Sequence, residues 1–284
     1  MRATTASVPA NAERTTLGRF LRRLALILGG SYLGVMGVLL WFENSLVFHP
    51  TTDKQDWVPP PAPEVQDVVL PTQDGAIHAW WWPTPGARGA ILYCHGNAGN
   101  LSHRGAAIGK IRDLLGESVL IFDYPGYGKS AGRPSEQGCY RSAEAAYDWL
   151  VDKQKIAADN IIIYGGSLGG GIAVDLASKR THRALVLVKS FTSAPDVGQS
   201  IYPWLPVRWL MRNRFDSLSK IGKCRKPVFI AHGTADSLIP FELGKQLYEA
   251  ANEPKMFFPI NGDDHNSPLP AACFIQLRDF LKKH

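Results

Sequence analysis

Short apolar runs alternate with amphipathic helical patterns along most of the chain, and this alternation limits the possible folds more than any other feature. The apolar runs are residues 90–94, 119–122, 161–164, 185–188, 228–231 and 256–260, and the helical patterns are residues 101–115, 137–151, 169–177, 241–251 and 270–282. Runs without polar alternation are typical of strands that are buried on both faces. Strands of this kind that alternate with helices predict an α/β fold, with a mostly parallel sheet covered by helices on both faces.

Two earlier strand-like runs indicate that one edge of the sheet is mixed. Residues 65–70 and 76–82 are separated by Gln73, Asp74 and Gly75, which favour a tight hairpin turn. The preceding stretch, residues 43–64, is rich in proline and is interpreted as an extended linker or an apron of the domain. We therefore expect one α/β domain over residues 65–284.

Residues 190–222 interrupt the alternation, because they contain no clear strand. An insertion at this place predicts a small cap over the carboxyl end of the sheet. Its aromatic residues could form the wall of an acyl pocket. Alternatively, they could pack a lid helix onto the domain or contact the bilayer. These residues are Phe191, Tyr202, Trp204, Trp209 and Phe215, and the nearby Arg208, Arg212 and Arg214 are expected to form a solvated face.

The N-terminal region predicts one transmembrane helix. Residues 24–42 carry no charge over 19 positions, which as a helix span roughly 28 Å, close to the thickness of a bilayer core. Arginines precede this segment in residues 1–23, so we expect a cytoplasmic N-terminus and a domain on the periplasmic side. A cleaved signal peptide and a buried first helix are the alternatives, although Trp41 and Phe42 make a poor cleavage site.

The net charge of +6 does not predict a nucleic-acid partner. Residues 1–48 hold five arginines and two glutamates, which is half of this charge, and the remaining charges are interspersed. The four cysteines form no CxxC motif or Cys/His cluster, so no metal site of the zinc type is expected. Whether the cysteines form disulfides stays open, although Cys94 lies in an apolar run and is interpreted as a buried apolar residue.

Residues 165–169 read Gly-Gly-Ser-Leu-Gly, a G-x-S-x-G motif between an apolar strand and a helix of small residues. In this context the serine is expected on a sharp turn, where its hydroxyl is exposed at the edge of the sheet. The start of the following helix offers main-chain N–H groups to a developing negative charge. Ser167 is therefore the predicted nucleophile.

A serine nucleophile needs a base and an acid, which in this arrangement follow it in the chain, each after a strand. Asp236 follows the strand at 228–231, and His265 follows the strand at 256–260. They are the predicted acid and base. The neighbouring Asp263 and Asp264 are expected to shape the loop or to cap the last helix, and His232 is expected to make a structural hydrogen bond.

The loop after the strand at 90–94 is expected to complete an oxyanion hole. Asn97, which follows His95 and Gly96, is the predicted donor through its main-chain N–H, together with the N–H of Leu168. The glycine-rich residues 123–130 lack the spacing of a phosphate loop and are interpreted as a sharp turn.

The ordered motifs together resemble a known family. They are HGNAGN at 95–100, DYPGYGKS at 123–130, GGSLGG at 165–170, HGTAD at 232–236 and DDHN at 263–266. They resemble the α/β-hydrolase branch that includes eukaryotic membrane-associated acyl-protein depalmitoylases and anchored bacterial hydrolases. The resemblance implies an α/β-hydrolase fold with eight strands and cofactor-free ester or thioester hydrolysis, and it places Ser167, Asp236 and His265 on the triad positions. Eukaryotic depalmitoylases have an acylated, cysteine-rich N-terminus, whereas residues 1–48 contain no cysteine.

The sequence thus predicts a membrane-anchored serine hydrolase that acts on small-molecule or lipid-like acyl esters. An aminopeptidase-like amide hydrolase, a perhydrolase and a non-catalytic binding protein on the same scaffold are the alternatives.

Overall fold

A computed structural model describes residues 10–284, with side chains from residue 18 onward. The chain divides into two compact units, residues 1–43 and residues 44–284, and each is described by itself. Part of the predicted basic segment, residues 1–23, lies outside the described residues.

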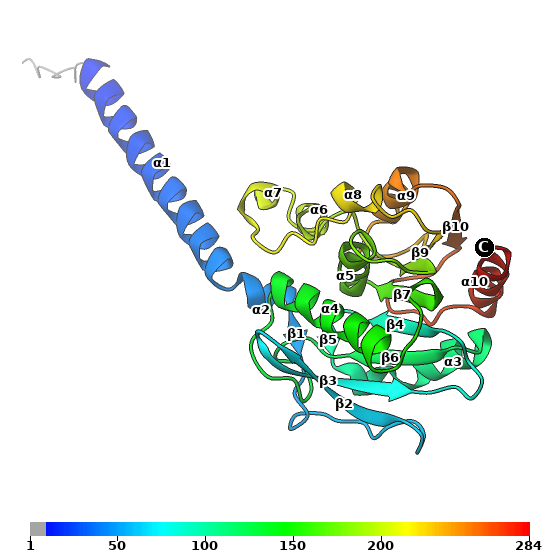
Figure 1. Ribbon diagram of the computed structural model, residues 1–284. Coiled ribbons are helices and arrows are strands. Elements are labelled where there is room, and N and C mark those ends of the chain that lie inside the picture. Colours follow the sequence, from blue (N-terminus) through cyan, green and yellow to red (C-terminus); the bar gives the residue numbers. More distant parts are fainter. Residues whose placement is uncertain (1–9) are drawn as a thin grey trace, which may run out of the picture. The chain divides into compact units, whose positions relative to one another are not determined.

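The first unit contains the long helix α1, Ala10–Trp41 (Figure 1). The helix starts before the uncharged segment and ends one residue earlier than the predicted boundary at Phe42. Within it, Gly18–Trp41 is long and apolar enough to cross a membrane, a property that N-terminal signal sequences share. Its apolar side chains, such as Leu26 and Leu33, are exposed rather than packed in a protein core.

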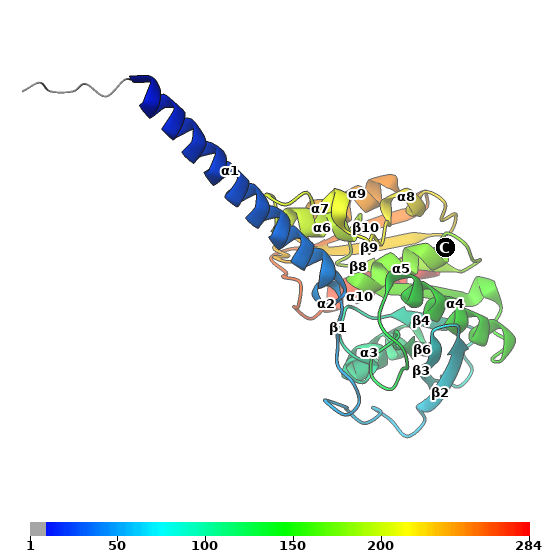
Figure 2. The ribbon, with the colours of Figure 1, turned by 90° about the vertical axis from the view of Figure 1, so that its left-hand side faces the viewer.

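The second unit is built on an eight-stranded sheet with the order β10-β9-β8-β7-β4-β6-β3-β2 (Figure 2). The strands are β2 Gln66–Thr72, β3 Gly75–Trp82, β4 Ala90–Cys94, β6 Ser118–Phe122, β7 Ile161–Gly166, β8 Ala184–Val188, β9 Val228–Gly233 and β10 Lys255–Ile260. The pairs from β10 to β6 are parallel, whereas β3 is antiparallel to both β6 and β2. The predicted parallel sheet with one mixed edge is confirmed.

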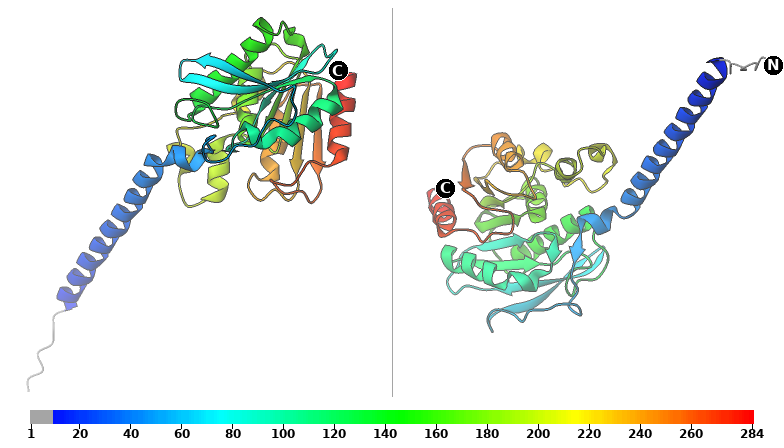
Figure 3. Two further views of the ribbon diagram at one scale, coloured as in Figure 1. Left: turned by 90° about the horizontal axis from the view of Figure 1, so that it is seen from below. Right: turned by 180° about the vertical axis from the view of Figure 1, so that it is seen from behind.

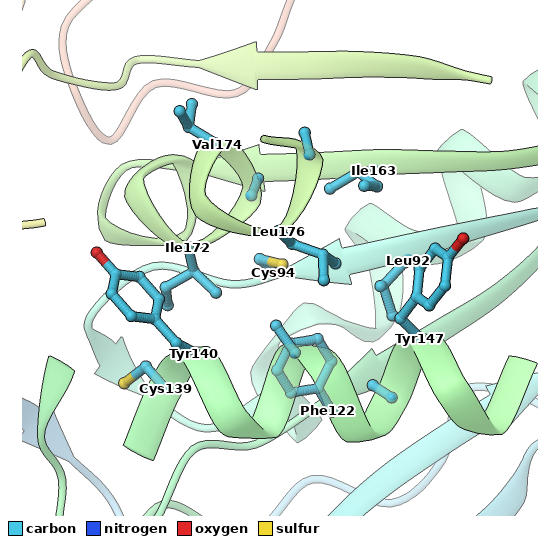
Figure 4. Packing of buried hydrophobic residues seen from close by; sticks show 14 of the residues in the cluster. Leu92, Cys94, Phe122, Cys139, Tyr140, Tyr147, Ile163, Ile172, Val174 and Leu176 are labelled. Atoms are coloured by element: carbon cyan, nitrogen blue, oxygen red, sulfur yellow. The ribbon is translucent and has the colours of Figure 1, made fainter. Parts of the chain in front are cut away.

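Helices cover both faces of this sheet. One face carries α4 Glu136–Asp152, α5 Leu168–Ala177 and α9 Phe241–Ala250, and the other carries α3 Gly105–Leu115 and α10 Ala271–Lys283, the red helix of Figure 3. All ten residues of α5 are buried, which its small side chains permit. Figure 4 shows the layer in which α4 and α5 pack together on the sheet, with Leu92, Cys94, Phe122, Cys139, Tyr140, Tyr147, Ile163, Ile172, Val174 and Leu176 labelled.

Of the two interpretations of residues 43–64, the structure agrees with an apron along the domain and not with a free linker. The folded unit begins at Asn44, not at residue 65. The short strand β1, His49–Pro50, pairs with β5, Ala98–Gly99, and Phe48 is buried. Further along, Trp57 packs against the rings of His78 and Trp80. This proline-rich stretch is thus bound along the domain, because its apolar side chains are buried there.

Residues 190–222 contain three short helices and no strand, as the sequence indicates. They are α6 Ala194–Ile201, α7 Val207–Leu210 and α8 Leu218–Ile221. Phe191 and Phe215, near the two ends of this segment, are buried in the domain, whereas residues 200–204, Trp209 and several others between them are exposed.

Candidate active site

Ser167 lies on the turn between β7 and α5, at the carboxyl edge of the sheet. Its φ of 52° and ψ of −123° fall in a region that residues with a side chain rarely adopt. The turn is held on both sides, since the N–H of Ser167 donates to Val188 O at 3.0 Å and the N–H of Gly170 donates to Ser167 O at 2.9 Å. A strained backbone that is fixed in this way is a frequent mark of functional sites.

The glycines of the motif allow α5 to approach the sheet closely. A Cβ atom at Gly169 would collide with the carbonyl oxygen of Cys94 and would lie 2.6 Å from that of His95. At Gly165, a Cβ atom would lie 2.7 Å from the Cβ of Ala173. At Gly166 the nearest atom would be 4.0 Å away. Two of the three glycines are thus required by packing, and both belong to the G-x-S-x-G pattern.

His265 and Asp236 lie beside Ser167, although they come from different loops. His265 Nε2 is 3.1 Å from Ser167 Oγ, and His265 Nδ1 is 2.8 Å from Asp236 Oδ2. With the carboxylate ionised, Nδ1 carries the proton and donates it, so Nε2 is left to accept the hydroxyl proton of Ser167. The structure therefore brings the three predicted residues together in the order serine, imidazole, carboxylate.

Asp236 is fixed by donors on every side. Its Oδ1 accepts the N–H groups of Leu238 at 3.0 Å and Ile239 at 2.7 Å. His232 Nε2 lies 3.4 Å from Asp236 Oδ2 and 3.0 Å from Ile239 O, so it has the structural role predicted for it. Burial alone would raise the pKa of Asp236, but hydrogen bonds from His232, His265 and Ile239 hold this pKa well below its ordinary value. The carboxylate is therefore charged at neutral pH.

The loop that was predicted to supply an oxyanion donor lies against the serine. A Cβ atom at Gly96 would be 3.5 Å from Ser167 Cβ. The side chain of Asn97 is turned away from Ser167, since its Nδ2 donates to Val47 O at 3.0 Å. The main-chain carbonyl oxygen of Asn97 accepts the hydroxyl of Tyr127 at 2.7 Å. Leu168 is the first residue of α5, where N–H groups have no partner within the helix.

Comparisons with known proteins agree with this fold. A profile described as the α/β hydrolase fold matches residues 89–217. An uncharacterized protein of Mycobacterium tuberculosis is 40% identical over 238 residues, which cover 83% of this chain and 84% of the relative. The α/β-hydrolase domain-containing protein WAV2 of Arabidopsis thaliana is 29% identical over 81% of this chain and 83% of its own length.

The chain belongs to the α/β-hydrolase family. Among solved structures, the esterase Pf2001 of Pyrococcus furiosus superimposes with a TM-score of 0.69 at 22% identity, over 83% of this chain and 98% of the esterase. This likeness shows that the hydrolase shares the fold of the esterase.

Lys189 is a residue of this hydrolase that sequence reasoning did not single out. It follows β8 directly, its side chain is buried, and its Nζ forms an ion pair with Asp263 Oδ2 at 2.6 Å. The same Nζ donates to the carbonyl oxygens of Asp264 at 2.6 Å, His265 at 3.1 Å and Ser267 at 2.9 Å. A lysine immediately after an all-apolar strand, at the edge that carries the site, was the signal in the sequence.

Asp263 and Asp264 shape the loop of His265, which was one of the two roles expected for them. The other role, capping the last helix, is not observed, because α10 begins after Pro270 without a side-chain cap. Asp264 Oδ1 instead accepts the N–H of Ser237 at 2.7 Å and its hydroxyl at 2.8 Å. Asp264 thus joins the loop of the base to the loop of the acid.

The predicted sharp turn at residues 123–130 has a further role in the α/β hydrolase. Tyr124 Oη donates to His95 O at 2.6 Å, and Tyr127 Oη donates to Asn97 O as described above. Both tyrosines are buried, and Asp123 Oδ1 accepts the N–H of Leu101 at 2.8 Å. This turn therefore fastens the loop that faces Ser167.

The aromatic residues of the 190–222 segment do not form one pocket wall, which corrects the acyl-pocket hypothesis. Phe215 is buried against Phe48 and Tyr140. Trp209 is exposed to 89% and Trp204 to 60%, so neither encloses a cavity. Within the part of the chain that the structure describes, no cluster of three or more His, Cys, Asp or Glu side chains could hold a metal ion.

Proposed function

We propose that this α/β hydrolase is a membrane-anchored serine hydrolase that cleaves carboxylic esters or thioesters through an acyl-enzyme. The observation that carries the proposal is the continuous hydrogen-bonded series from Ser167 Oγ through His265 to Asp236, with separations of 3.1 and 2.8 Å. The strained turn beneath Ser167 supports it, because such a turn exposes a nucleophilic hydroxyl.

In the acylation step, His265 Nε2 removes the hydroxyl proton of Ser167 while Oγ bonds to the carbonyl carbon of the substrate. The negative charge on the carbonyl oxygen would be stabilised by the main-chain N–H groups of Leu168 and Asn97. His265 then gives the proton to the departing alcohol or thiol, and Asp236 stays ionised and orients the imidazole. In the deacylation step, His265 removes a proton from a water molecule, which attacks the carbonyl carbon of the acyl-enzyme. His265 then returns a proton to Ser167 Oγ, and the carboxylic acid leaves.

We propose that α1 anchors the protein as a single-pass helix, with the N-terminus in the cytoplasm and the hydrolase domain in the periplasm. The length and hydropathy of Gly18–Trp41 and the arginines before it support this orientation. Protease treatment of intact spheroplasts and of lysed cells is the test, because the domain should be cleaved in both. Protection of the domain in intact spheroplasts would contradict this orientation.

The ester and thioester assignment rests on the site chemistry and on the fold shared with an esterase. An acyl series from acetate to dodecanoate, as p-nitrophenyl esters and as thioesters, should be compared with a panel of aminoacyl amides by kcat/KM. Higher kcat/KM for the amides would favour an aminopeptidase-like hydrolase and overturn the ester assignment. The length dependence among the esters would report the acyl group that the site accepts.

Ser167→Ala tests the nucleophile directly. The wild-type protein should react with a fluorophosphonate probe and hydrolyse p-nitrophenyl esters, and the variant should lose both, with kcat falling by about 10⁴-fold or more. Labelling that persists in a folded Ser167→Ala variant would remove Ser167 from the role. A wild-type protein without labelling or hydrolysis would instead indicate a binding protein on a hydrolase scaffold.

A further inference from the structure

The middle of the insertion exposes an unusual set of apolar side chains. Over residues 201–212, here called the 201–212 segment, Ile201 and Tyr202 are nearly half exposed, Trp204 is 60% exposed and Trp209 is 89% exposed. Figure 1 shows the helices on which the segment is built, α6 and α7, side by side at one end of the folded unit. Aromatic side chains gathered on a surface indicate a partner, because exposed apolar patches are otherwise unfavourable in water.

The charged residues within the 201–212 segment are Arg208 and Arg212. The longer stretch 196–216 holds three arginines and two aspartates, Asp196 and Asp216, which leaves a net charge of +1. Arg208 Nε pairs with Asp196 Oδ1 at 2.9 Å, and its side chain is still 60% exposed. The surface therefore combines tryptophan and tyrosine with a net positive charge, which is the combination that binds the interface of an anionic bilayer.

The chain itself would keep the domain close to a membrane. Helix α1 ends at Trp41 and the second unit begins at Asn44. The connection covers about 10 Å even when fully extended. If α1 spans the membrane, as in the proposed function, Asn44 is held within about 10 Å of the end of the helix, so the domain stays beside the bilayer.

We propose that the 201–212 segment is a membrane-docking surface, which inserts Trp209 and its aromatic neighbours into the interface of an anionic bilayer. This inference rests on the proposed anchor. It extends the proposed function, because the 190–222 insertion that contains the segment begins at the site: Ser190 Oγ donates to Ser167 O at 3.3 Å. A docked segment would favour acyl esters that partition into the bilayer over esters dissolved in water.

A fluorophore at position 209 tests the docking. The natural cysteines are free and buried, so Trp209→Cys can be labelled selectively with bimane in the folded full-length protein. Val69→Cys is the matched control, since Val69 is 66% exposed on β2. Both proteins are reconstituted into vesicles of phosphatidylcholine with phosphatidylglycerol, with iodide on both sides of the bilayer. A residue inserted ~5–10 Å into the interface should be quenched by iodide roughly tenfold less than the control and should be quenched by a lipid-chain nitroxide.

Equal iodide quenching of the two probes in these vesicles would overturn the docking surface. Protection of position 209 that persists in detergent and grows with protein concentration would also overturn it, because a second copy of the chain would then cover the segment. Arg208→Glu in the Trp209→Cys background should restore iodide quenching if anionic lipid is the partner, and unchanged protection would contradict the role of charge.

Two further measurements separate this proposal from the proposed function. Retention of the protein in carbonate-washed vesicles reports the anchor, and fluorophosphonate labelling reports Ser167. If both are positive while the probe at 209 stays accessible to iodide, the docking surface is wrong and the proposed function stands. If the protein is extracted by carbonate, the anchor fails and the docking proposal fails with it.

Discussion

The Nζ atom of Lys189 lies 2.6 Å from Oδ2 of Asp263, in a place where the lysine side chain is 5% exposed and the aspartate side chain 10%. The charge of the lysine is therefore neutralised by Asp263. The N–H groups of the lysine donate hydrogen bonds to three main-chain carbonyls of the loop from Asp264 to Ser267. That loop carries His265. One buried cation at the end of β8 thus fixes the position of the imidazole from behind.

Lys189→Met should disturb both stability and activity, because it leaves the Asp263 carboxylate and three carbonyls without their donor. Removal of one partner of a buried ion pair costs about 3–5 kcal/mol of unfolding free energy. A shift of the imidazole by ~1 Å lowers kcat/KM by about 10²-fold. Urea unfolding and ester hydrolysis measure the two effects.

The Lys189→Met/Asp263→Asn double variant separates the ion pair from the positioning of the loop. It should recover part of the unfolding free energy, because the unpaired charge is gone, but it should not recover kcat/KM, because the three carbonyls still lack their donor. A Lys189→Met variant with wild-type kcat/KM would show that His265 is positioned without the lysine.

Gly169 and Gly166 provide a matched pair for testing the packing beneath Ser167. Gly169→Ala places a methyl group against the carbonyl of Cys94, so unfolding free energy should fall by about 3 kcal/mol or more. Gly166→Ala meets nothing closer than 4.0 Å and should fold with nearly unchanged stability. Thermal unfolding of both variants checks this, and an equally large loss in Gly166→Ala would contradict the packing argument.

The inner strands of the sheet could be predicted from the sequence because they are short apolar runs that are buried on both faces. The strand at residues 161–164, for example, lies within β7, Ile161–Gly166. The pairing of β1 with β5 could not be predicted, since two residues such as His49 and Pro50 show no periodicity. The sequence allows either a linker or an apron from Asn44 to residue 64, because a proline-rich composition does not show that Phe48 is buried.

The positions of Ser167, Asp236 and His265 could be inferred because each follows a strand at the carboxyl edge of one parallel sheet. The contacts of Lys189 and Tyr127 depend on how loops far apart in the sequence meet, and no local pattern reports this. The aromatic residues of the insertion likewise show that a local sequence pattern does not report tertiary contacts. Phe215 and Trp209 look equivalent in sequence, yet one is buried and the other is exposed, because only tertiary packing distinguishes them.

The cysteines should be free and unreactive in the folded protein. All four are buried, and burial raises the pKa of Cys224 to about 12 and that of Cys273 to about 11. Since the thiolate is the reactive form, a disulfide reagent at about pH 8 should find almost no reactive thiol before unfolding. After unfolding without reductant, four thiols should react. A smaller number would indicate disulfides, and rapid reaction of the folded protein would contradict the burial.

The lowered pKa of Asp236 makes a prediction about the pH dependence of activity. A lowered pKa means that the carboxylate keeps its charge as the pH falls, so Asp236 should not take up a proton down to about pH 4, near the ordinary pKa of aspartate. Protonation of Asp236 therefore contributes nothing to the loss of activity above about pH 4. A plot of log kcat/KM against pH should fall with a slope no greater than one on the acid side down to that pH, and a slope that approaches two above pH ~4 would show that Asp236 titrates.

Asp236→Asn provides the companion measurement. The amide nitrogen of asparagine can donate to His265 Nδ1, which moves the imidazole proton to Nε2 and removes the acceptor for the Ser167 hydroxyl. We expect kcat to fall by about 10⁴-fold, while the backbone N–H groups of Leu238 and Ile239 keep an oxygen acceptor and the fold is retained. Circular dichroism and thermal unfolding verify the fold. A folded Asp236→Asn variant with nearly wild-type kcat would show that the carboxylate does not orient the base, and the acid would then have to be sought elsewhere in the chain.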